Sequence, residues 1–539
     1  MASTVVRKRW HTLAWALLLT AIALMARLHR LDAFITPDEF KWVCRSVNFY
    51  RGLAYGDLAR TLQTGHPGVL TMWLGVPWMG LDPTEGWLGF CVTDSVSDII
   101  EAVPIETTHR LAAALFAARR GVALLTALAV AGAFWLLDRL FDRRIALLAG
   151  LLIALDPFFV AHSRFLHLDA ILTGALFLSA LSLLAGLRER SRGLLALSGV
   201  LGGLAVLQKS PGMFVLPYAA LVIGGWGLLE RRRPAWFIGH GLLWLAPLLF
   251  TYGIMWPSMW VQPLATLKLV FDTATDYAGN PHEKSNYFWG APRPDPGPAF
   301  YPVALLFRLT PWSLLGALLA LPQRMAIRPK TINQAERARG ENTACQRWIL
   351  WALAAFVVFY TLFMTLGQKK FDRYLLPVFP FVDALAAVGL VALGDRLASR
   401  RPRWRKPLWG ALGGMVALSA VALSFIYSPY YLAYYNPLVG GPRTAVRTLL
   451  VGWGEGLELA AHYLNNLPDV QHTPVASRAL PGFAAYYRGP AYDEGNYDPA
   501  NTRYVVVYLN DAQRRLSPEI LERFTDIARP EYVARIHGI

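Results

Sequence analysis

Long apolar runs recur along the whole chain and set its architecture. Each run is close to the ~20 residues that a helix needs to cross a bilayer. The first run is too long, and too poorly followed by a small-residue cleavage site, to be a removed signal peptide. We therefore expect it to be retained as the first of about eleven transmembrane helices, at residues 12–28, 112–137, 145–160, 170–187, 194–208, 213–229, 236–255, 301–320, 348–366, 374–394 and 408–426.

The composition agrees with this pattern. Of the 539 residues, 55% are hydrophobic and only 16% are charged. A soluble chain of this length carries about 25% charged residues. The sequence therefore predicts a multi-pass membrane protein and not a soluble one.

The formal net charge of +16 is concentrated in short loops between the runs. Basic clusters recur at every second loop, which is the distribution expected of cytoplasmic loops. With eleven spans, the N-terminus is cytoplasmic, the C-terminus is extracytoplasmic and every cluster lies inside, so no nucleic-acid partner is needed to explain the charge. The clusters are Arg7, Lys8, Arg9; Arg139, Arg143, Arg144; Arg188, Arg190, Arg192; Arg231, Arg232, Arg233; Arg324, Arg328, Lys330; and Arg400, Arg401, Arg403, Arg405, Lys406.

Two units follow from this threading. We expect residues 1–426 to form a transmembrane domain, to which the motifs described below assign catalysis, and residues 427–539 to form an extracytoplasmic domain. The first outer loop, 29–111, contains amphipathic stretches at Phe40–Leu58 and Pro67–Leu81 that are typical of interfacial helices.

Other segments have a character of their own. Residues 256–300, rich in Pro, Gly, Trp and Tyr, predict an ordered outer loop, and the polar insert 327–346 predicts a flexible cytoplasmic loop. The tail combines a helical stretch (Leu457–Leu464), a strand-like run (Tyr504–Tyr508) and a second helix (Pro518–Phe524), which indicates a small α/β fold.

The three cysteines do not form a framework. Cys44 and Cys91 both fall on the predicted outer side, where either a disulfide or two free thiols is consistent with the sequence. Cys345 is predicted to be cytoplasmic and reduced.

Asp38 and Glu39 follow directly after the first span, in Thr36-Pro37-Asp38-Glu39-Phe40. One interpretation is structural: Thr36, Pro37 and Glu39 fit an N-cap, a first-turn proline and a capping-box glutamate. The other is catalytic, because a carboxylate at the membrane surface is suited to taking a proton from an attacking hydroxyl. The two interpretations are compatible, since capping would fix the helix that orients Asp38.

Cations on the predicted outer side break the charge rule that the rest of the chain obeys. An anion held at the outer interface would explain them, and phosphate is the obvious candidate because Arg pairs with it bidentately and Lys adds a point charge. The alternative is that Arg164 snorkels and Asp169 caps the next helix. The cations on the predicted outer side are Arg164, Lys209, Lys369, Lys370 and Arg373.

Three further motifs are less specific. His66-Pro67 reads as a loop ending at a helix start, although it lies close to the acid pair. Phe371-Asp372-Arg373-Tyr374 opens a span and is equally typical of an interfacial anchor. Gly452-Trp453-Gly454-Glu455-Gly456 reads as a glycine-rich turn into a helix, because it lacks the full dinucleotide-binding pattern. The sequence contains no P-loop, zinc-ligand spacing or nucleophilic-serine elbow.

Together these residues resemble glycosyltransferase family 39, the protein O-mannosyltransferases and their bacterial relatives, which have the GT-C membrane fold. The acid pair is similar to the family's acidic motif, His66-Pro67 to its His-Pro-Pro motif with Gly68 in place of the second proline, and Ser163–Asp169 to a further family segment. Lys209 in Gln208-Lys209-Ser210-Pro211 and the run Arg373–Pro377 have counterparts as well. The resemblance covers roughly residues 10–395.

The resemblance implies a mainly α-helical GT-C bundle that transfers a sugar, with inversion, from a polyprenyl-phosphate carrier to an acceptor on the extracytoplasmic face of the inner (plasma) membrane. It assigns catalysis to Asp38 and Glu39, with Asp38 as the base. It leaves the donor sugar open and the acceptor open among protein, lipid and glycan. Family members differ over a divalent metal, and the sequence offers no clear ligand set for one. The remaining roles are binding of the donor phosphate by Arg164, Lys209, Lys369 and Arg373, and positioning of substrate by His66, Asp169 and Tyr374.

A transporter or flippase of lipid-linked sugars is the rival interpretation. It would also need cations on the outer face and an apolar groove. It would not need a carboxylate pair in a large outer loop, and the sequence shows none of the internal repeats common in transporters. A membrane-anchored scaffold would leave the outer-face cations unexplained.

Overall fold

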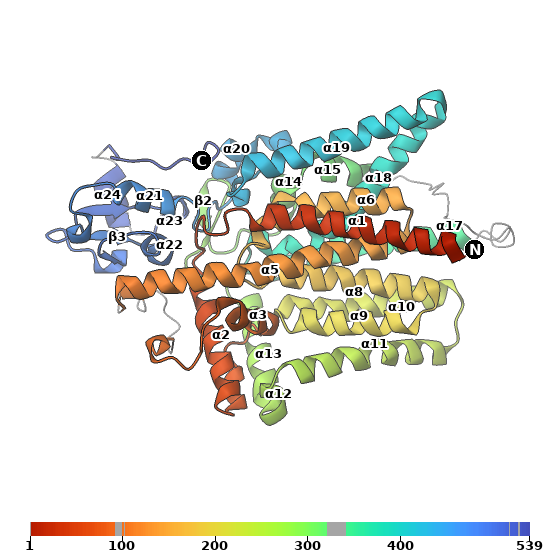
Figure 1. Ribbon diagram of the computed structural model, residues 1–539, viewed down its shortest axis with the longest axis horizontal. Coiled ribbons are helices and arrows are strands. Elements are labelled where there is room, and N and C mark those ends of the chain that lie inside the picture. Colours follow the sequence, from red (N-terminus) through yellow and green to blue (C-terminus); the bar gives the residue numbers. More distant parts are fainter. Residues whose placement is uncertain are drawn as a thin grey trace.

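The computed structural model describes residues 2–91, 97, 100–101, 103–320, 341–400, 402–516, 518–525 and 529–539. Long helices run side by side along the longest axis of the molecule, with the N-terminus near one end and a small mixed unit at the other (Figure 1). Within these described ranges, eight helices are long and apolar enough to cross a membrane, or up to nine if one bent pair is counted as a single span. The protein is therefore a mainly helical, multi-pass membrane protein, as the sequence predicts.

All eleven predicted segments are helical, although not all are long. Those that span by length are α1 (Ala2–Leu28), α5 (Ile105–Leu140), α8 (Asp169–Glu189), α10 (Val215–Leu229) with the 3-10 turn η3 (Ser210–Phe214) before it, α11 (Pro234–Met255), α17 (Glu341–Leu366), α18 (Phe379–Arg400) with η4 (Asp372–Val378) before it, and α19 (Arg405–Tyr427).

Three predicted spans are shorter or broken. The first, α6 (Arg143–Leu155), ends at Asp156, and the chain continues as the short α7 (Pro157–His162). The second, α9 (Arg192–Val206), has 15 residues. The third is bent by 115° between α14 (Phe300–Arg308) and α15 (Pro311–Ala320). Pro157 and Pro311 explain two of the breaks, because proline stops the preceding residues from continuing a helix.

The bundle has a clear centre. In α8 and in the η4–α18 span, 89% and 94% of the most apolar window is buried, whereas the values for α11 and α19 are 22% and 17%. Exposed apolar side chains on the peripheral helices include Phe250 and Phe425. An apolar surface of this kind is expected of helices that face lipid.

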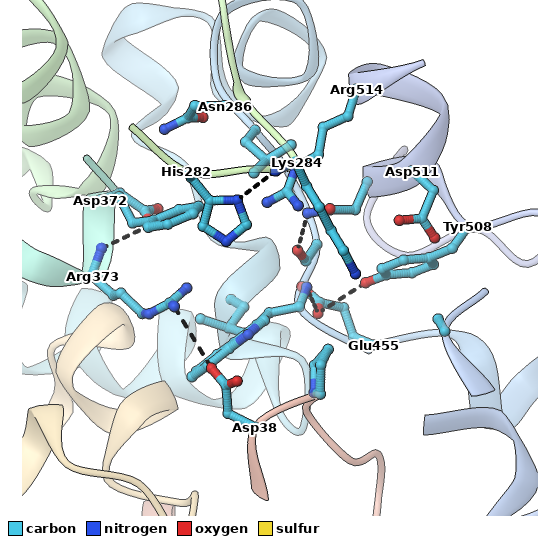
Figure 2. A pocket seen from close by; sticks show the side chains of 18 of the residues that line it. Asp38, His282, Lys284, Asn286, Asp372, Arg373, Glu455, Tyr508, Asp511 and Arg514 are labelled. Carbon is cyan, nitrogen blue, oxygen red and sulfur yellow. Dashed lines mark hydrogen bonds and ion pairs between the residues drawn. The ribbon is translucent and has the colours of Figure 1, made fainter. Parts of the chain in front are cut away.

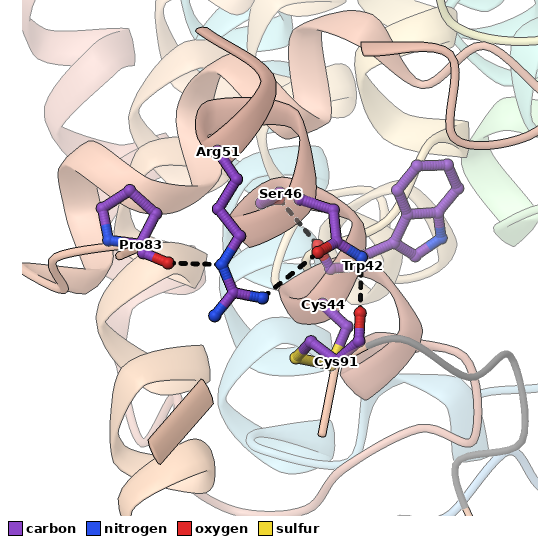
Figure 3. The surroundings of a disulfide bond; sticks show 7 residues. Trp42, Cys44, Ser46, Arg51, Pro83 and Cys91 are labelled. Atoms are coloured by element: carbon purple, nitrogen blue, oxygen red, sulfur yellow. Dashed lines mark hydrogen bonds between the residues drawn. A yellow bond between two sulfur atoms is a disulfide. The ribbon is translucent and has the colours of Figure 1, made fainter. Parts of the chain in front are cut away.

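In the described part of the first outer loop, α2 (Glu39–Ala54) and α3 (Val69–Met79) lie at the two predicted amphipathic stretches. A disulfide joins Cys44 of α2 to Cys91 (Figure 3), which decides the alternative that the sequence left open. Asn48 donates to the backbone carbonyl of Cys91 at 2.5 Å, and Arg51 donates to that of Pro83 at 2.6 Å. The helix that follows Asp38 is thus fastened to the loop that returns to α5.

The prediction that residues 256–300 form a loop is wrong for the first half of that segment. This half folds into α12 (Ser258–Val261) and α13 (Pro263–Gly279). Proline at the start of α13 was read as a loop signal, but it is well tolerated in the first helical turn, where its missing N–H has no partner to lose. The second half contains an antiparallel pair of strands, β1 (Asn286–Phe288) and β2 (Ala291–Arg293).

The C-terminal unit is a small α/β structure, as the tail sequence predicts. Three short parallel strands lie in the order β4-β3-β5. The strands are β3 (Val475–Ser477), β4 (Ala491–Tyr492) and β5 (Tyr504–Val506), and the helices are α20 (Gly441–Thr448), α21 (Leu457–Leu464), α22 (Leu480–Ala484), α23 (Leu509–Arg514) and α24 (Pro518–Thr525). The boundary at residue 427 stays a prediction, and the polar insert predicted at 327–346 lies largely outside the described residues.

This unit packs against the N-terminal part of the chain. Tyr486 donates to the backbone carbonyl of Asp32 at 2.8 Å, and a ring nitrogen of His109 lies 3.0 Å from the carbonyl of Tyr487. These contacts place the C-terminal unit against the segment where α1 leaves the bundle and against the first turns of α5.

Candidate active site

Asp38 lies directly before α2 and lines a cavity of about 520 Å³ (Figure 2). Its side chain is 34% exposed, and Oδ2 lies 3.7 Å from Nη2 of Arg373 and 3.8 Å from Nε2 of His167. Partial burial raises the pKa of Asp38, but the positive charge of Arg373 and the proximity of His167 outweigh burial and lower the pKa below its usual value. Asp38 is therefore an ionised carboxylate that is open to the cavity.

Glu39 has a structural position, which corrects the expectation that it is catalytic. Its side chain is fully buried and forms an ion pair with the buried Arg119. Oε1 accepts from Nε of Arg119 at 2.8 Å and from the backbone N–H of Leu166 at 2.9 Å, and Oε2 accepts from that of Thr36 at 2.9 Å. The last bond is half of the predicted capping box, although the helix begins at Glu39 and not at Pro37.

Asp169 and Lys209 form a buried pair behind Asp38. Nζ of Lys209 lies 2.8 Å from Oδ1 of Asp169. Oδ2 of Asp169 faces Nδ1 of His167 at 3.3 Å and Nε of Arg373 at 3.8 Å. Burial lowers the pKa of Lys209, and Asp169 opposes that change. Asp169 opens α8 without capping it, so the structure brings it to the cations, contrary to the capping alternative.

His167 connects the two carboxylates, because its ring faces Asp38 through Nε2 and Asp169 through Nδ1. No role was predicted for this histidine, which lies within the Ser163–Asp169 motif. Its spacing two residues before Asp169 was the available signal.

Tyr374 and Lys369 extend the cluster. Nζ of Lys209 lies 4.2 Å from the centre of the Tyr374 ring, and Nζ of Lys369 lies 3.5 Å from the centre of the Tyr277 ring. Burial and Arg373 lower the pKa of Lys369. Aromatic faces stabilise cations at these distances, so both lysines can remain charged while partly desolvated.

His66 meets the same tyrosine from another side, with its ring centre 4.2 Å from that of Tyr277. Both ring nitrogens are buried and have no hydrogen-bond partner among the described residues. Burial, Lys209 and Lys369 lower the pKa of His66 to about 3. His66 is therefore neutral, with a free donor and a free acceptor next to the cations.

Arg164 does not join this cluster, which corrects its expected role at a donor phosphate. Its side chain is 3% exposed and donates to four backbone carbonyls where α1 ends. The acceptors are Ala26 at 3.1 Å, Arg27 at 3.2 Å, His29 at 2.7 Å and Arg30 at 2.8 Å. The carbonyls of Ala26 and Arg27 are among those that α1 leaves without partners at its C-terminus, and the other two follow directly, so Arg164 acts as a cap and does not snorkel. Lys370 is likewise occupied, by Asp295 at 2.7 Å.

The glycine-rich turn before α21 contributes Trp453, which sequence reasoning missed. Its ring centre lies 4.5 Å from the guanidinium carbon of Arg373 and 5.1 Å from the ring centre of His167. The flanking Gly452 and Gly454 have φ values of +91° and +114°. A Cβ on Gly454 would lie 2.2 Å from the backbone carbonyl of Ile35, so only glycine permits this approach.

Hydrogen bonds within the C-terminal unit also stabilise this glycine-rich turn. Glu455 accepts from the backbone N–H of Trp453 at 2.7 Å, and the hydroxyl of Tyr508 accepts from that of Gly454 at 2.7 Å. The C-terminal unit therefore supplies one wall of the cavity. The Gly-Trp-Gly spacing was the available signal, but it does not indicate which distant segment the tryptophan contacts.

A cation-rich cluster beside one open carboxylate is suited to binding a phosphate and accepting a proton. In the part of the chain that the structure describes, no group of three or more His, Cys, Asp or Glu side chains is arranged to hold a metal ion. Metal dependence stays an open prediction.

Comparison with known proteins gives one family and several structures. Residues 105–256 match the family described as dolichyl-phosphate-mannose-protein mannosyltransferase. The chain is similar to ArnT from Cupriavidus metallidurans bound to undecaprenyl phosphate, with 15% identity, coverage of 99% of this chain and 97% of that chain, and a TM-score of 0.47. No curated protein sequence gives a match.

Two other structures have lower scores. One is the archaeal oligosaccharyltransferase AglB from Archaeoglobus fulgidus in complex with an inhibitory peptide and a dolichol-phosphate, with 13% identity, coverage of 92% of this chain and 65% of that chain, and a TM-score of 0.44. The other is the protein O-mannosyltransferase complex Pmt1-Pmt2 from S. cerevisiae bound to the sugar donor, with 17% identity, coverage of 52% and 38%, and a TM-score of 0.33.

The matched segment contains α8 with Asp169, the Ser163–Asp169 motif and Lys209. The resemblance read from the motifs is thereby confirmed. Residues 105–256 of this chain are thus similar to the dolichyl-phosphate-mannose-protein mannosyltransferase family.

Proposed function

We propose that this protein transfers a sugar from a polyprenyl-phosphate carrier to an acceptor hydroxyl, with inversion, on the extracytoplasmic side of the inner (plasma) membrane. The proposal rests mainly on how the three acidic side chains of the site differ in exposure and in their partners. Asp38 is open to the cavity beside Arg373, whereas Glu39 is sealed by Arg119 and Asp169 is bound to Lys209. Of these three carboxylates, Asp38 alone is open to the cavity, and the other two hold the site together.

The step would proceed as follows. Asp38 accepts the proton of the acceptor hydroxyl as its oxygen attacks the anomeric carbon. The bond from that carbon to the phosphate oxygen breaks on the opposite side, which inverts the centre, and the bonding pair leaves with the carrier phosphate. Arg373, Lys209 and Lys369 are placed to stabilise the departing charge.

The low pKa of Asp38 shapes this mechanism. A carboxylate that ionises easily is a weak base, and general-base catalysis is most effective when the pKa lies near the working pH. Because phosphate is already a good leaving group, charge stabilisation by the cations supplies the larger share of the acceleration in this proposal. His66 and Tyr374, which lie beside the lysines, would position the donor.

The outer location rests on two independent observations. Basic clusters lie at every second loop, as expected for cytoplasmic loops. The Cys44–Cys91 disulfide lies in the first outer loop, and disulfides persist in oxidising compartments outside the cytoplasm. Both favour a cytoplasmic N-terminus with the cavity and the C-terminus outside.

A transporter of lipid-linked sugars remains the rival function. It would use the cations but has no need for an ionised carboxylate beside them. Formation of glycosylated product by the purified protein in detergent, where no second compartment exists, would exclude transport as the sole activity.

The decisive experiment compares Asp38→Asn with the wild-type protein. The donor is first identified by mass spectrometry of polyprenyl-phosphate sugars that copurify, and product formation is then followed in liposomes. We expect Asp38→Asn to lower transfer by about 10²–10⁴-fold while undecaprenyl-phosphate binding is retained. Asp272→Asn, which removes an exposed acid on α13, is the matched control and should be fully active. Retained transfer in Asp38→Asn would exclude Asp38 as the base.

A further inference from the structure

The cavity continues past Asp38 to a second end that the proposed reaction does not use. We define this distal end by five further lining residues: His282, Lys284, Asp511 and Arg514, which Figure 2 labels, and Arg478. His282 and Lys284 lie in the turn between α13 and β1, Arg478 follows β3, and Asp511 and Arg514 belong to α23. The distal end is thus built mainly by segments beyond the ends of the spanning helices.

Phe371 joins the two ends. Its ring centre lies 4.6 Å from the guanidinium carbon of Arg373 and 5.9 Å from that of Arg514. The guanidinium carbons of Arg373 and Arg514 are therefore separated by no more than the sum of these two distances. One sugar unit with a substituent is long enough to reach from one to the other. The ring of His282 packs against the same phenylalanine at 5.2 Å.

Three cations gather at the distal end. Lys284, Arg478 and Arg514 interact electrostatically with Asp511, Asp493 acts on Lys284, and Glu283 also lines the cavity. In the described residues, neither Lys284 nor Arg514 forms a side-chain ion pair, and Nε of Arg514 is buried without a hydrogen-bond partner. His282 stays neutral, because burial and the neighbouring Arg514 lower its pKa to about 3.

The neighbouring cations also repel one another. Partial burial and Arg478 lower the pKa of Lys284 although Asp511 opposes this change. Burial lowers the pKa of Arg514 to about 10, with Arg373 and Arg478 adding to the effect against Asp511. An anion bound between these side chains would relieve that repulsion, and Arg with Lys is the pairing that suits a phosphate.

We propose that the distal end binds a phosphate group on the acceptor, so that the acceptor of this transferase is a phosphorylated molecule. This inference rests on the proposed function, because it assumes that an acceptor hydroxyl reaches Asp38. The phosphate would serve as an anchor, bound by Lys284 and Arg514 across Phe371 from the reacting centre. The carrier phosphate occupies the other end, next to Lys209 and Arg373.

The test uses the purified full-length chain in detergent with saturating undecaprenyl phosphate, which fills the carrier end. The melting temperature is measured against inorganic phosphate, with sodium acetate and sodium chloride at matched ionic strength. We expect phosphate to stabilise the wild-type protein beyond both other salts. Lys284→Gln and Arg514→Gln should each weaken phosphate binding about tenfold to a hundredfold, because each loses a charged hydrogen-bond donor.

Two control variants separate this inference from the proposed function. Lys268→Gln removes an exposed lysine of α13 that pairs with Asp272, and it should respond to phosphate like the wild-type protein. Asp38→Asn should also respond normally, so phosphate binding is tested even if transfer proves absent. An equal phosphate response in Lys284→Gln and Arg514→Gln, no response in the wild-type protein, or an equal response to acetate would each overturn the inference.

Discussion

Substitutions at the adjacent acids Asp38 and Glu39 should affect different properties, activity in one case and stability in the other. Asp38 is open to the cavity, whereas Glu39 is fully buried against Arg119. Substituting Glu39→Ala removes the counter-charge of Arg119 and the acceptor for two backbone N–H groups, those of Thr36 and Leu166. We therefore expect Glu39→Ala to destabilise the protein and Asp38→Asn to inactivate it.

The magnitude follows from the burial of the pair. Breaking a buried ion pair by removing one partner costs about 3–5 kcal/mol, because the remaining charge is left without compensation. Each buried N–H that loses its acceptor adds about 1–3 kcal/mol where no water reaches it. Arg119 keeps the carbonyls of Leu31 and Phe34, so the effect of Glu39→Ala should lie near the lower end of the summed costs.

The assay has two readouts, thermal unfolding in detergent and transfer rate per folded molecule. Glu39→Ala should unfold well below the wild-type melting temperature, whereas Asp38→Asn should match it. Arg119→Ala and the double variant complete a thermodynamic cycle, in which the double variant should cost less than the two single variants combined because no charge is left unpaired. A Glu39→Ala protein with normal melting and no transfer would refute this reasoning and return Glu39 to the catalytic group.

Three further predictions follow from individual contacts. Arg373→Gln should weaken undecaprenyl-phosphate binding about tenfold to a hundredfold, whereas Arg164→Gln should lower the melting temperature and leave that affinity unchanged; the reverse ranking would restore Arg164 to the phosphate site. Burial raises the pKa of Glu458 to about 7, so the folded state holds a proton that the unfolded state releases; its stability contribution is full below about pH 4.5 and is lost as the pH rises through 7. Melting temperatures from pH 5 to 8 should therefore fall less steeply in Glu458→Gln than in the wild-type protein, and parallel profiles would contradict the assignment. Replacing Cys44 and Cys91 by Ala should cost up to about 4 kcal/mol, the loop entropy of a 47-residue closure, seen as a lower melting temperature that no longer responds to reductant; a variant as stable as the oxidised protein would show that the bond constrains little.

The spans were predictable because hydrophobic length is a local property that the bilayer fixes. Their number was not, because a run such as 301–320 is apolar throughout yet bends sharply at Pro311. Asp38, Asp169, Lys209 and Arg373 were grouped from the sequence because the expected threading puts them on one side of the membrane, and the structure brings these four close together. The separate roles of the charged residues could not be predicted, because only the packing shows that Arg164 caps α1 and that Glu39 faces Arg119.

Residues of the tail were the hardest to predict. Trp453 lies against Arg373, although the two residues are far apart in the sequence. Hydrophobic periodicity relates only residues within one helix or strand, so it could not predict this contact. The α/β character of the tail is visible in its alternation of helix and strand patterns, but which wall it builds depends on long-range contacts such as the approach of Gly454 to Ile35. Single-sequence reasoning has no access to such contacts.

The meeting of Gly454 with Ile35 has a consequence for biogenesis. Residues near position 35 leave the ribosome early, whereas the turn that covers them is synthesised more than 400 residues later. A nascent chain therefore holds the acid and the cations in an incomplete chamber. If the proposed transfer takes place in this cavity, a nascent chain lacks the wall that carries Trp453 until that later turn has been made.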